Sequence, residues 1–145
     1  MSDPRYYLGK IVKSLEKFYD VNTRRIQVKS RPSLIIGFEP NYTSILDIDF
    51  ELLPISSLQN QTPDPIYDVL IDAPLFSQLG LTHKSYIRTH KIAWNHVKHI
   101  VLNQPIGDIK SDFPRLYNHI LNLNQQWVNT RTQNNLVTVT NKSII

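Results

Sequence analysis

The sequence predicts a small, mainly β protein with one C-terminal helix, folded as a strongly bent antiparallel sheet or barrel. Short apolar, β-branched segments alternate with turn sequences through most of the chain. Nine prolines and four glycines are typical of a protein rich in strands and turns. A long apolar pattern at helical spacing is found only near the C-terminus. Five to seven short strands followed by a single helix fit this fold class.

The length of 145 residues indicates one domain with an adequate core. We expect residues 1–128 to form a barrel domain with its helix, and residues 129–145 to be a polar tail that is disordered or a peripheral strand. The chain has no cysteine, which excludes disulfides, thiolate metal sites and cysteine nucleophiles. It also lacks an apolar run of the roughly 20 residues needed to span a membrane and a signal-peptide core. A cytoplasmic protein without membrane contact is therefore expected.

The expected strands follow one another with short turns between them. They cover residues 6–12, 33–38, 44–55, 66–72 and 85–91, and a last strand over 100–102 and 105–109. Residues 13–29 are polar and irregular, which predicts a loop, and residues 74–80 predict a short helical turn. The C-terminal helix is expected from Phe113 to Trp127, with Ser111 as its cap, and its apolar stripe should cover one end of the sheet.

Two groups of residues contain the side-chain types that bind metal ions. Asp47, Asp49 and Glu51 alternate with apolar residues, so they should share one face of a strand, where no histidine supports them. We expect that face to be solvated. The five histidines show no metal-site spacing either, so neither a metal nor a cofactor is predicted.

Positive charge is concentrated near the N-terminus. Seven Lys or Arg residues lie between Lys10 and Arg31, close to only Glu16 and Asp20, whereas residues 39–72 hold seven acids and no base. Clustered positive charge favours a polyanionic partner and speeds its encounter. The alternative is a solvated basic face without a ligand.

Two short motifs place phosphate-binding groups beside apolar strands. Lys29-Ser30-Arg31-Pro32 precedes an aliphatic run, and Pro32 pushes Arg31 towards extended geometry, which would hold its guanidinium at the entrance of a strand. Pro54-Ile55-Ser56-Ser57 ends the next strand with two hydroxyls. Without further context, a surface ion-pair partner is the favoured interpretation of Arg31, with a phosphate ligand as the alternative, and Ser56 is interpreted as a turn residue.

These motifs and three later ones resemble the MazF/PemK family of toxins from bacterial toxin–antitoxin modules. The later segments are Gly80-Leu81, Ser85-Tyr86-Ile87-Arg88 and Ile106-Gly107-Asp108-Ile109. Their order and spacing agree with the family over residues 7–128. The resemblance implies an SH3-like antiparallel barrel of the MazF, PemK and CcdB type, and a homodimer.

The resemblance also implies a function and a set of site residues. The function is that of a metal-independent endoribonuclease that cuts single-stranded RNA to a 2′,3′-cyclic phosphate and is neutralised by an acidic antitoxin. Its catalytic residues would be Arg31, Ser56, Arg88 and His90. Ser56 stands where threonine is common, and His90 where the PemK branch has an aspartate, although histidine can also transfer a proton near neutral pH. The RNA-binding residues would be Arg24, Arg25, Lys29, Ser57, Phe18 and Tyr19.

Other functions fit the same fold. One is a non-catalytic interaction protein of the gyrase-poison type, as in CcdB. Another is a degenerate toxin that binds nucleic acid and has lost cleavage. His90 is equally well read as a residue that only packs on the surface of the barrel.

Overall fold

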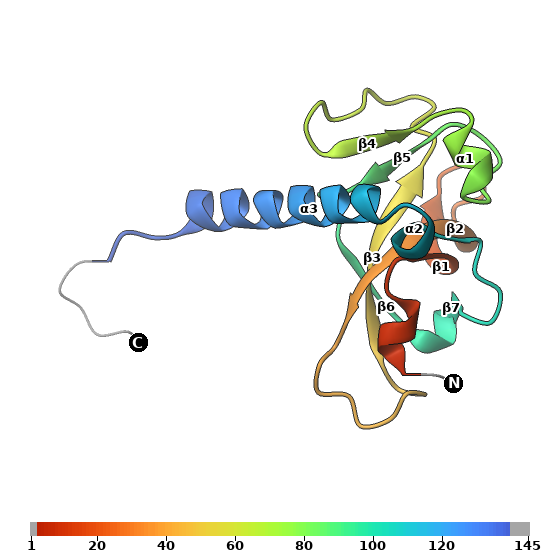
Figure 1. Cartoon of the computed structure of the whole chain (residues 1–145), viewed down its shortest axis with the longest axis horizontal. Coiled ribbons are helices and arrows are strands. Elements are labelled where there is room, and N and C mark those ends of the chain that lie inside the picture. The colour runs from red at the N-terminus through yellow and green to blue at the C-terminus, as the bar shows by residue number, and fades with distance from the viewer. Residues whose placement is uncertain (1–2, 140–145) are drawn as a thin grey trace.

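An antiparallel sheet of eight strands forms the body of the molecule, and a long C-terminal helix packs against it (Figure 1). The computed structural model describes residues 3–139. The strands are β1 (Lys10–Asp20), β2 (Arg25–Phe38), β3 (Asp49–Ser56), β4 (Asp68–Ile71), β5 (Ser85–Arg88), β6 (Ala93–His96), β7 (Ile100–Val101) and β8 (Gly107–Asp108). The helices are η1 (Pro4–Tyr7), α1 (Leu75–Gln78), η2 (Val97–His99), α2 (Ile109–Asp112) and α3 (Pro114–Asn135). The predicted mainly β fold with a C-terminal helix is confirmed.

The sheet is strongly bent but does not close. Its strand order is β4-β5-β3-β2-β1-β7, with β6 beside β3 and β8 beside β1. The chain passes from β6 through η2 to β7, yet no ladder joins β6 to β7 or β1 in the described part of the chain. The Asn95 amide spans this gap by donating to Ser14 Oγ at 2.8 Å and to the Leu15 carbonyl at 3.0 Å. Of the two expected forms, a strongly bent sheet or a barrel, the structure is thus the open, bent sheet.

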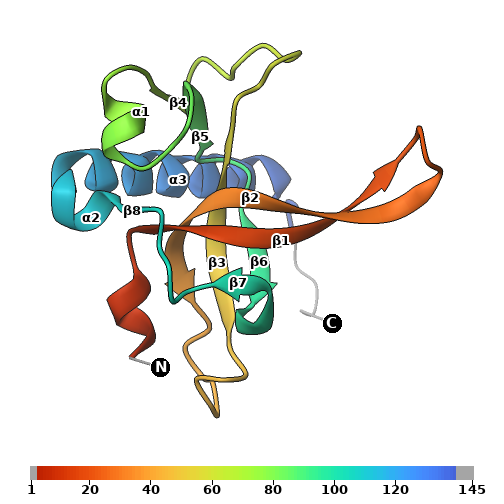
Figure 2. The same cartoon turned by 90° about the vertical axis from the view of Figure 1, so that its right-hand side faces the viewer.

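The expected loop over residues 13–29 is instead most of a long β-hairpin. Strands β1 and β2 pair through ten consecutive positions, from Ile11 opposite Leu34 to Asp20 opposite Arg25, and the outer part of the hairpin projects from the body (Figure 2). Beyond Ser14 neither face of this hairpin is covered by the core. Residues 15–20 do not alternate between apolar and polar side chains, whereas residues 25–29 do alternate, a strand signal that the prediction of a loop overlooked.

Several other boundaries differ from the expected ones. The first strand was expected from residue 6, but Pro4–Tyr7 form a short 3-10 helix that Asp3 caps. The strand therefore begins only at Lys10. The third strand begins only at Asp49, since residues 44–47 form a turn. Strand β6 was not predicted, and β5 ends at Arg88.

The C-terminal helix also differs from the prediction. It is preceded by the short helix α2, which Asp108 caps by accepting from the Ser111 backbone N–H; Ser111 is not the cap. Helix α3 continues to Asn135. The expectation of a disordered or strand-forming tail from residue 129 is therefore wrong for residues 129–135. Residues 136–139 form no helix or strand, and residues 140–145 lie outside the described part.

The sheet is buried on both faces by two apolar clusters. One cluster lies between the sheet and α3, where Tyr117 and Ile120 of the predicted stripe are buried. The other contains Ile48 and Phe50 and packs against the opposite face. The two clusters alternate along β2, where Leu34 belongs to the first and Ile35 to the second.

A buried amide connects α3 to the turn that follows β5. Asn124 is nearly fully buried, and its Nδ2 donates to the Thr89 carbonyl at 2.9 Å. The Thr89 hydroxyl in turn donates to the Tyr67 carbonyl at 2.7 Å. These bonds link the helix to β5 and to the segment before β4.

We expect Asn124→Ala to lower the free energy of unfolding by about 1–3 kcal/mol, because the buried Thr89 carbonyl loses its donor. Urea denaturation measures this change. Asn122→Ala, at an exposed position of the same helix, should stay within about 0.5 kcal/mol of the wild type. Equal effects of the two substitutions would show that the amide does not connect helix and turn.

Candidate functional site

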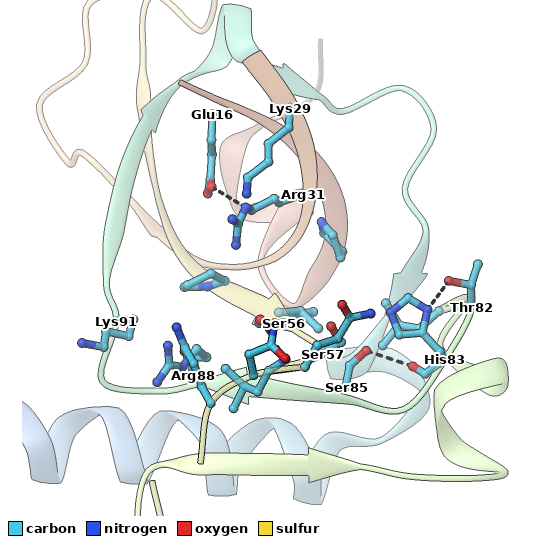
Figure 3. A pocket seen from close by; sticks show the side chains of 18 residues that line it. Glu16, Lys29, Arg31, Ser56, Ser57, Thr82, His83, Ser85, Arg88 and Lys91 are labelled. Atoms are coloured by element: carbon cyan, nitrogen blue, oxygen red, sulfur yellow. Dashed lines mark hydrogen bonds and ion pairs between the residues drawn. The ribbon is translucent and has the colours of Figure 1, made fainter. Parts of the chain in front are cut away.

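A groove of about 770 Å³ opens between the β1–β2 hairpin and the ends of β3 and β5 (Figure 3). The hairpin contributes Glu16, Lys29 and Arg31 to one wall. The other wall is formed by residues 54–61 and by residues 81–91 in part. Segments that are far apart in the sequence thus meet around one concave surface.

The groove opens where β3 changes its pairing partner. The ladder between β2 and β3 ends at Ser33 opposite Pro54, and neither Pro32 nor Pro54 has an N–H with which to extend it. Strand β3 then pairs with β5 instead, through Ile55 and Ser56. Beyond Pro54, β2 and β3 therefore separate, and the groove fills the space between them.

This register brings Arg31 and Ser56 to the two walls of the groove. Arg31 lies two residues before Ser33, and Ser56 lies two residues after Pro54, so the two side chains occupy corresponding positions just beyond the last pair. Both line the groove. Arg31 is in the middle of β2, not at a strand entrance as expected, because β2 begins at Arg25.

Arg31 is paired with a carboxylate on the neighbouring strand. Its Nε lies 3.2 Å from Glu16 Oε2, and both side chains are about one-third exposed. The contact is an ion pair without a hydrogen bond at Nε. The Nη atoms of Arg31 make no hydrogen bond within residues 3–139 and remain available to a ligand.

Ser56 presents a hydroxyl that is oriented by the next turn. Its Oγ accepts a hydrogen bond from the Leu58 backbone N–H at 3.2 Å. Leu58 has a positive φ of 51°, which turns the chain sharply so that Ser56 and Ser57 both line the groove. Since Oγ accepts this bond, its proton is free to be donated to an anion.

Arg88 enters the groove from the end of β5. Its Nε donates to Asp68 Oδ1 at 3.1 Å, and the Asp68 side chain is completely buried. Lys91 lines the same end of the groove. Among the described residues, four lining side chains are cationic (Lys29, Arg31, Arg88 and Lys91) and Glu16 alone is acidic. The groove is therefore suited to an anion.

His90 does not line the groove. It lies in the turn after β5, where its Nδ1 is 3.8 Å from Asp68 Oδ1 and its ring is stacked at a tilt on Tyr67, 5.7 Å away. Burial lowers the pKa of His90, against the opposing effect of the Asp68 carboxylate. The structure thus brings together Arg31, Ser56 and Arg88 of the predicted catalytic residues, but not His90.

The predicted RNA-binding residues divide in the same way. Lys29 and Ser57 line the groove. Arg24 and Arg25 are exposed at the tip of the hairpin, away from it. Phe18 and Tyr19 do not line the groove either. Phe18 supports Lys29, whose Nζ lies 4.5 Å from the centre of its ring, and Tyr19 is on the opposite face of the hairpin.

Sequence reasoning missed several side chains that line the groove, among them Lys91, Glu16 and His83. Glu16 shares a face of β1 with Ser14 and Phe18, but this alternation has no meaning unless residues 13–20 are recognised as a strand. His83 lies at the other end, and its Nδ1 is 2.9 Å from Thr82 Oγ1. Gly80 places this loop: it has a positive φ of 76°, and a Cβ there would collide with the Ile106 carbonyl.

The comparisons with known proteins give no role for the groove. Comparison of the sequence with protein-family models and with curated proteins finds no match.

In residues 3–139 no three His, Asp or Glu side chains converge as a metal site would require, and no helix has the length and apolarity to cross a membrane. The MazF/PemK resemblance stays a prediction, and the groove is interpreted from its own chemistry.

The buried position of His90 makes a pH dependence of stability testable. Because its pKa in the folded protein is below the ordinary 6.5, the unfolded chain takes up the proton first as the pH falls. Stability that is present above pH 6.5 is then lost at lower pH. Between about pH 7.5 and pH 5, urea denaturation should show a larger loss of stability in the wild type than in His90→Asn. Parallel pH profiles would contradict the assignment to His90.

Proposed function

We propose that the groove binds single-stranded RNA and that the protein cleaves it by attack of the 2′-hydroxyl on the neighbouring phosphorus, without a metal ion. The observation that carries the proposal is the convergence of Arg31, Ser56 and Arg88 on one groove. A guanidinium keeps its charge at any physiological pH and binds two phosphate oxygens with parallel N–H groups. Two such groups on opposite walls suit a phosphodiester held between them.

Cleavage requires a base that accepts the 2′-hydroxyl proton, groups that stabilise the charge of the transition state, and a proton for the departing O5′. Glu16 is the carboxylate that reaches into the groove, and we assign it, in place of His90, as acceptor of the 2′-hydroxyl proton. As the bond from O2′ to phosphorus forms, Arg31 and Arg88 stabilise the charge on the phosphorane oxygens, and Ser56 donates a hydrogen bond. The bond to O5′ then breaks, and O5′ takes a proton from solvent. The products are a 2′,3′-cyclic phosphate and a free 5′-hydroxyl.

The walls of the groove also suit the bases of a single strand. Gln59, Asn60 and Gln61 line it beside Ser57, and each carboxamide both donates and accepts hydrogen bonds. The edges of unpaired bases present the same two kinds of group. Among the described residues no Phe, Tyr or Trp lines the groove, and His83 is its one aromatic ring, so recognition mainly by hydrogen bonds is proposed.

A nuclease of this kind would need to be restrained in the cell. An acidic, extended segment of an antitoxin would compete with RNA for the four cationic side chains of the groove. The proposed setting is therefore a toxin–antitoxin module, in line with the motif resemblance.

The experiment that tests the proposal is cleavage of a single-stranded RNA oligonucleotide in excess chelator, with products identified by mass spectrometry. Wild-type protein should yield a 2′,3′-cyclic phosphate, and the matching DNA should stay intact. Arg31→Ala should lower kcat/KM by about 10²–10³-fold, because a charged donor to the phosphorane is lost. Arg115→Ala, which removes the same charge from an exposed position of α3, is the matched control.

Three outcomes would count against this assignment. RNA that binds in the groove but is never cut would favour the non-catalytic, nucleic-acid-binding alternative. RNA that does not bind would reject the groove as its site. Cleavage that survives Arg31→Ala unchanged would place the reaction elsewhere.

The substitution Glu16→Gln tests the role of Glu16 in proton transfer separately from RNA binding. We expect kcat to fall by about 10²–10⁴-fold, because the acceptor for the 2′-hydroxyl proton is lost. RNA should bind as well as or better than to the wild type, since a negative charge leaves the groove. Single-turnover cleavage and fluorescence anisotropy measure the two quantities. Asp112→Asn, an exposed carboxylate outside the groove, is the control, and an unchanged kcat in Glu16→Gln would refute the role.

A further inference from the structure

We propose that Asp68, a carboxylate buried behind the groove, is a positioning residue that holds Arg88 in the orientation needed to bind the scissile phosphate. Asp68 does not line the groove and would not touch the substrate. It would act only through Arg88. The inference rests on the proposed function and extends it to a residue that none of the motifs contains.

The Asp68 carboxylate has a fixed orientation. Asp68 stands directly opposite Arg88 in the β4–β5 ladder, and its side chain is 0% exposed. Oδ1 accepts from Arg88 Nε at 3.1 Å, and Oδ2 accepts from the Asp64 backbone N–H at 2.7 Å. Because each oxygen is held by a different partner, rotation of the carboxylate would break one of the two bonds.

The contact with Asp68 leaves both Nη atoms of the Arg88 guanidinium free to bind an anion. Arg88 bonds to Asp68 through Nε, and its side chain makes no other hydrogen bond within the described residues. The N–H groups on both Nη atoms remain for the phosphate oxygens. An arginine held at Nε has fewer rotamers to lose when it binds an anion, so more of the binding energy is retained.

The ion pair between Asp68 and Arg88 is not explained by its contribution to stability alone. A buried ion pair is often no more stabilising than apolar residues of the same size, because both charges lose their hydration. Glu16 makes a comparable contact with Arg31, but its side chain is 31% exposed and lines the groove. Of these two carboxylates, Asp68 alone is out of reach of substrate, which separates orientation from proton transfer.

The decisive experiment is a double-mutant cycle of Asp68→Asn and Arg88→Ala on cleavage of the RNA oligonucleotide. With Arg88 present, Asp68→Asn should lower kcat by about 10–100-fold, as expected for a misplaced catalytic group, with a smaller change in KM. In the Arg88→Ala background, Asp68→Asn should have no further effect. An equal loss of activity in both backgrounds would show a general structural role and overturn the proposal.

Two further variants cover the possibility that Asp68→Asn does not fold. Arg88→Lys keeps the charge but has no Nε–H for Asp68. It should lose kcat while it still binds RNA, and full activity would overturn the need for a fixed guanidinium. Asp72→Asn is the matched control, because Asp72 is an exposed carboxylate outside the groove whose side chain accepts from the Ala73 backbone N–H. It should leave kcat unchanged.

A measurement without RNA separates this proposal from the proposed function. The Arg88 Nε–H signal in NMR should exchange slowly with water in the wild type and in Asp72→Asn, and rapidly in Asp68→Asn. It should also shift when inorganic phosphate is added. A wild-type protein that cleaves no RNA but shows both effects would refute the nuclease and support the positioning. A signal that exchanges rapidly in the wild type would refute the positioning.

Discussion

The change of partner along β3 is the constraint on which the groove depends. The strand pairs with β2 as far as Pro54 and with β5 from Ile55 onward. Two prolines without N–H groups coincide with the end of the first ladder, and Leu53 and Ile55 on either side of the change are buried in the core. The core therefore holds β3 in place while its two neighbours diverge, and the space between those neighbours is concave and polar.

Two guanidiniums reach this space, and each is paired with a carboxylate through Nε. The pairs differ in their surroundings, since Arg88 is hydrogen bonded to a fully buried carboxylate and Arg31 is in ion contact with a partly exposed one. In both cases the Nη side of the fork makes no hydrogen bond to the described residues. Positive charge is thus held in place before a ligand arrives, which reduces the entropy lost on binding.

The long hairpin carries one wall of the groove on a part of the sheet that the core does not cover. Glu16 and Lys29 lie opposite each other there, and Phe18 supports Lys29 from the same face. The other face holds Leu15, Tyr19, Ile26 and Val28, all exposed. The two faces of one hairpin therefore have different chemistry, because side chains alternate along each strand.

The sequence by itself determined the fold class, since β-branched runs, prolines and a late helical stripe each report on local geometry. It also pointed to Arg31, Ser56 and Arg88 as candidate phosphate ligands, and all three line the groove. The first strand of the hairpin could not be predicted, because residues 15–20 do not alternate between apolar and polar side chains. The positions of Glu16 and Asp68 could not be predicted either. Only the tertiary structure decided that Glu16 faces the groove, that Asp68 lies behind Arg88 and that His90 turns away. Those positions depend on pairing between distant strands, and the register of such pairs is set by the core and not by the residues themselves.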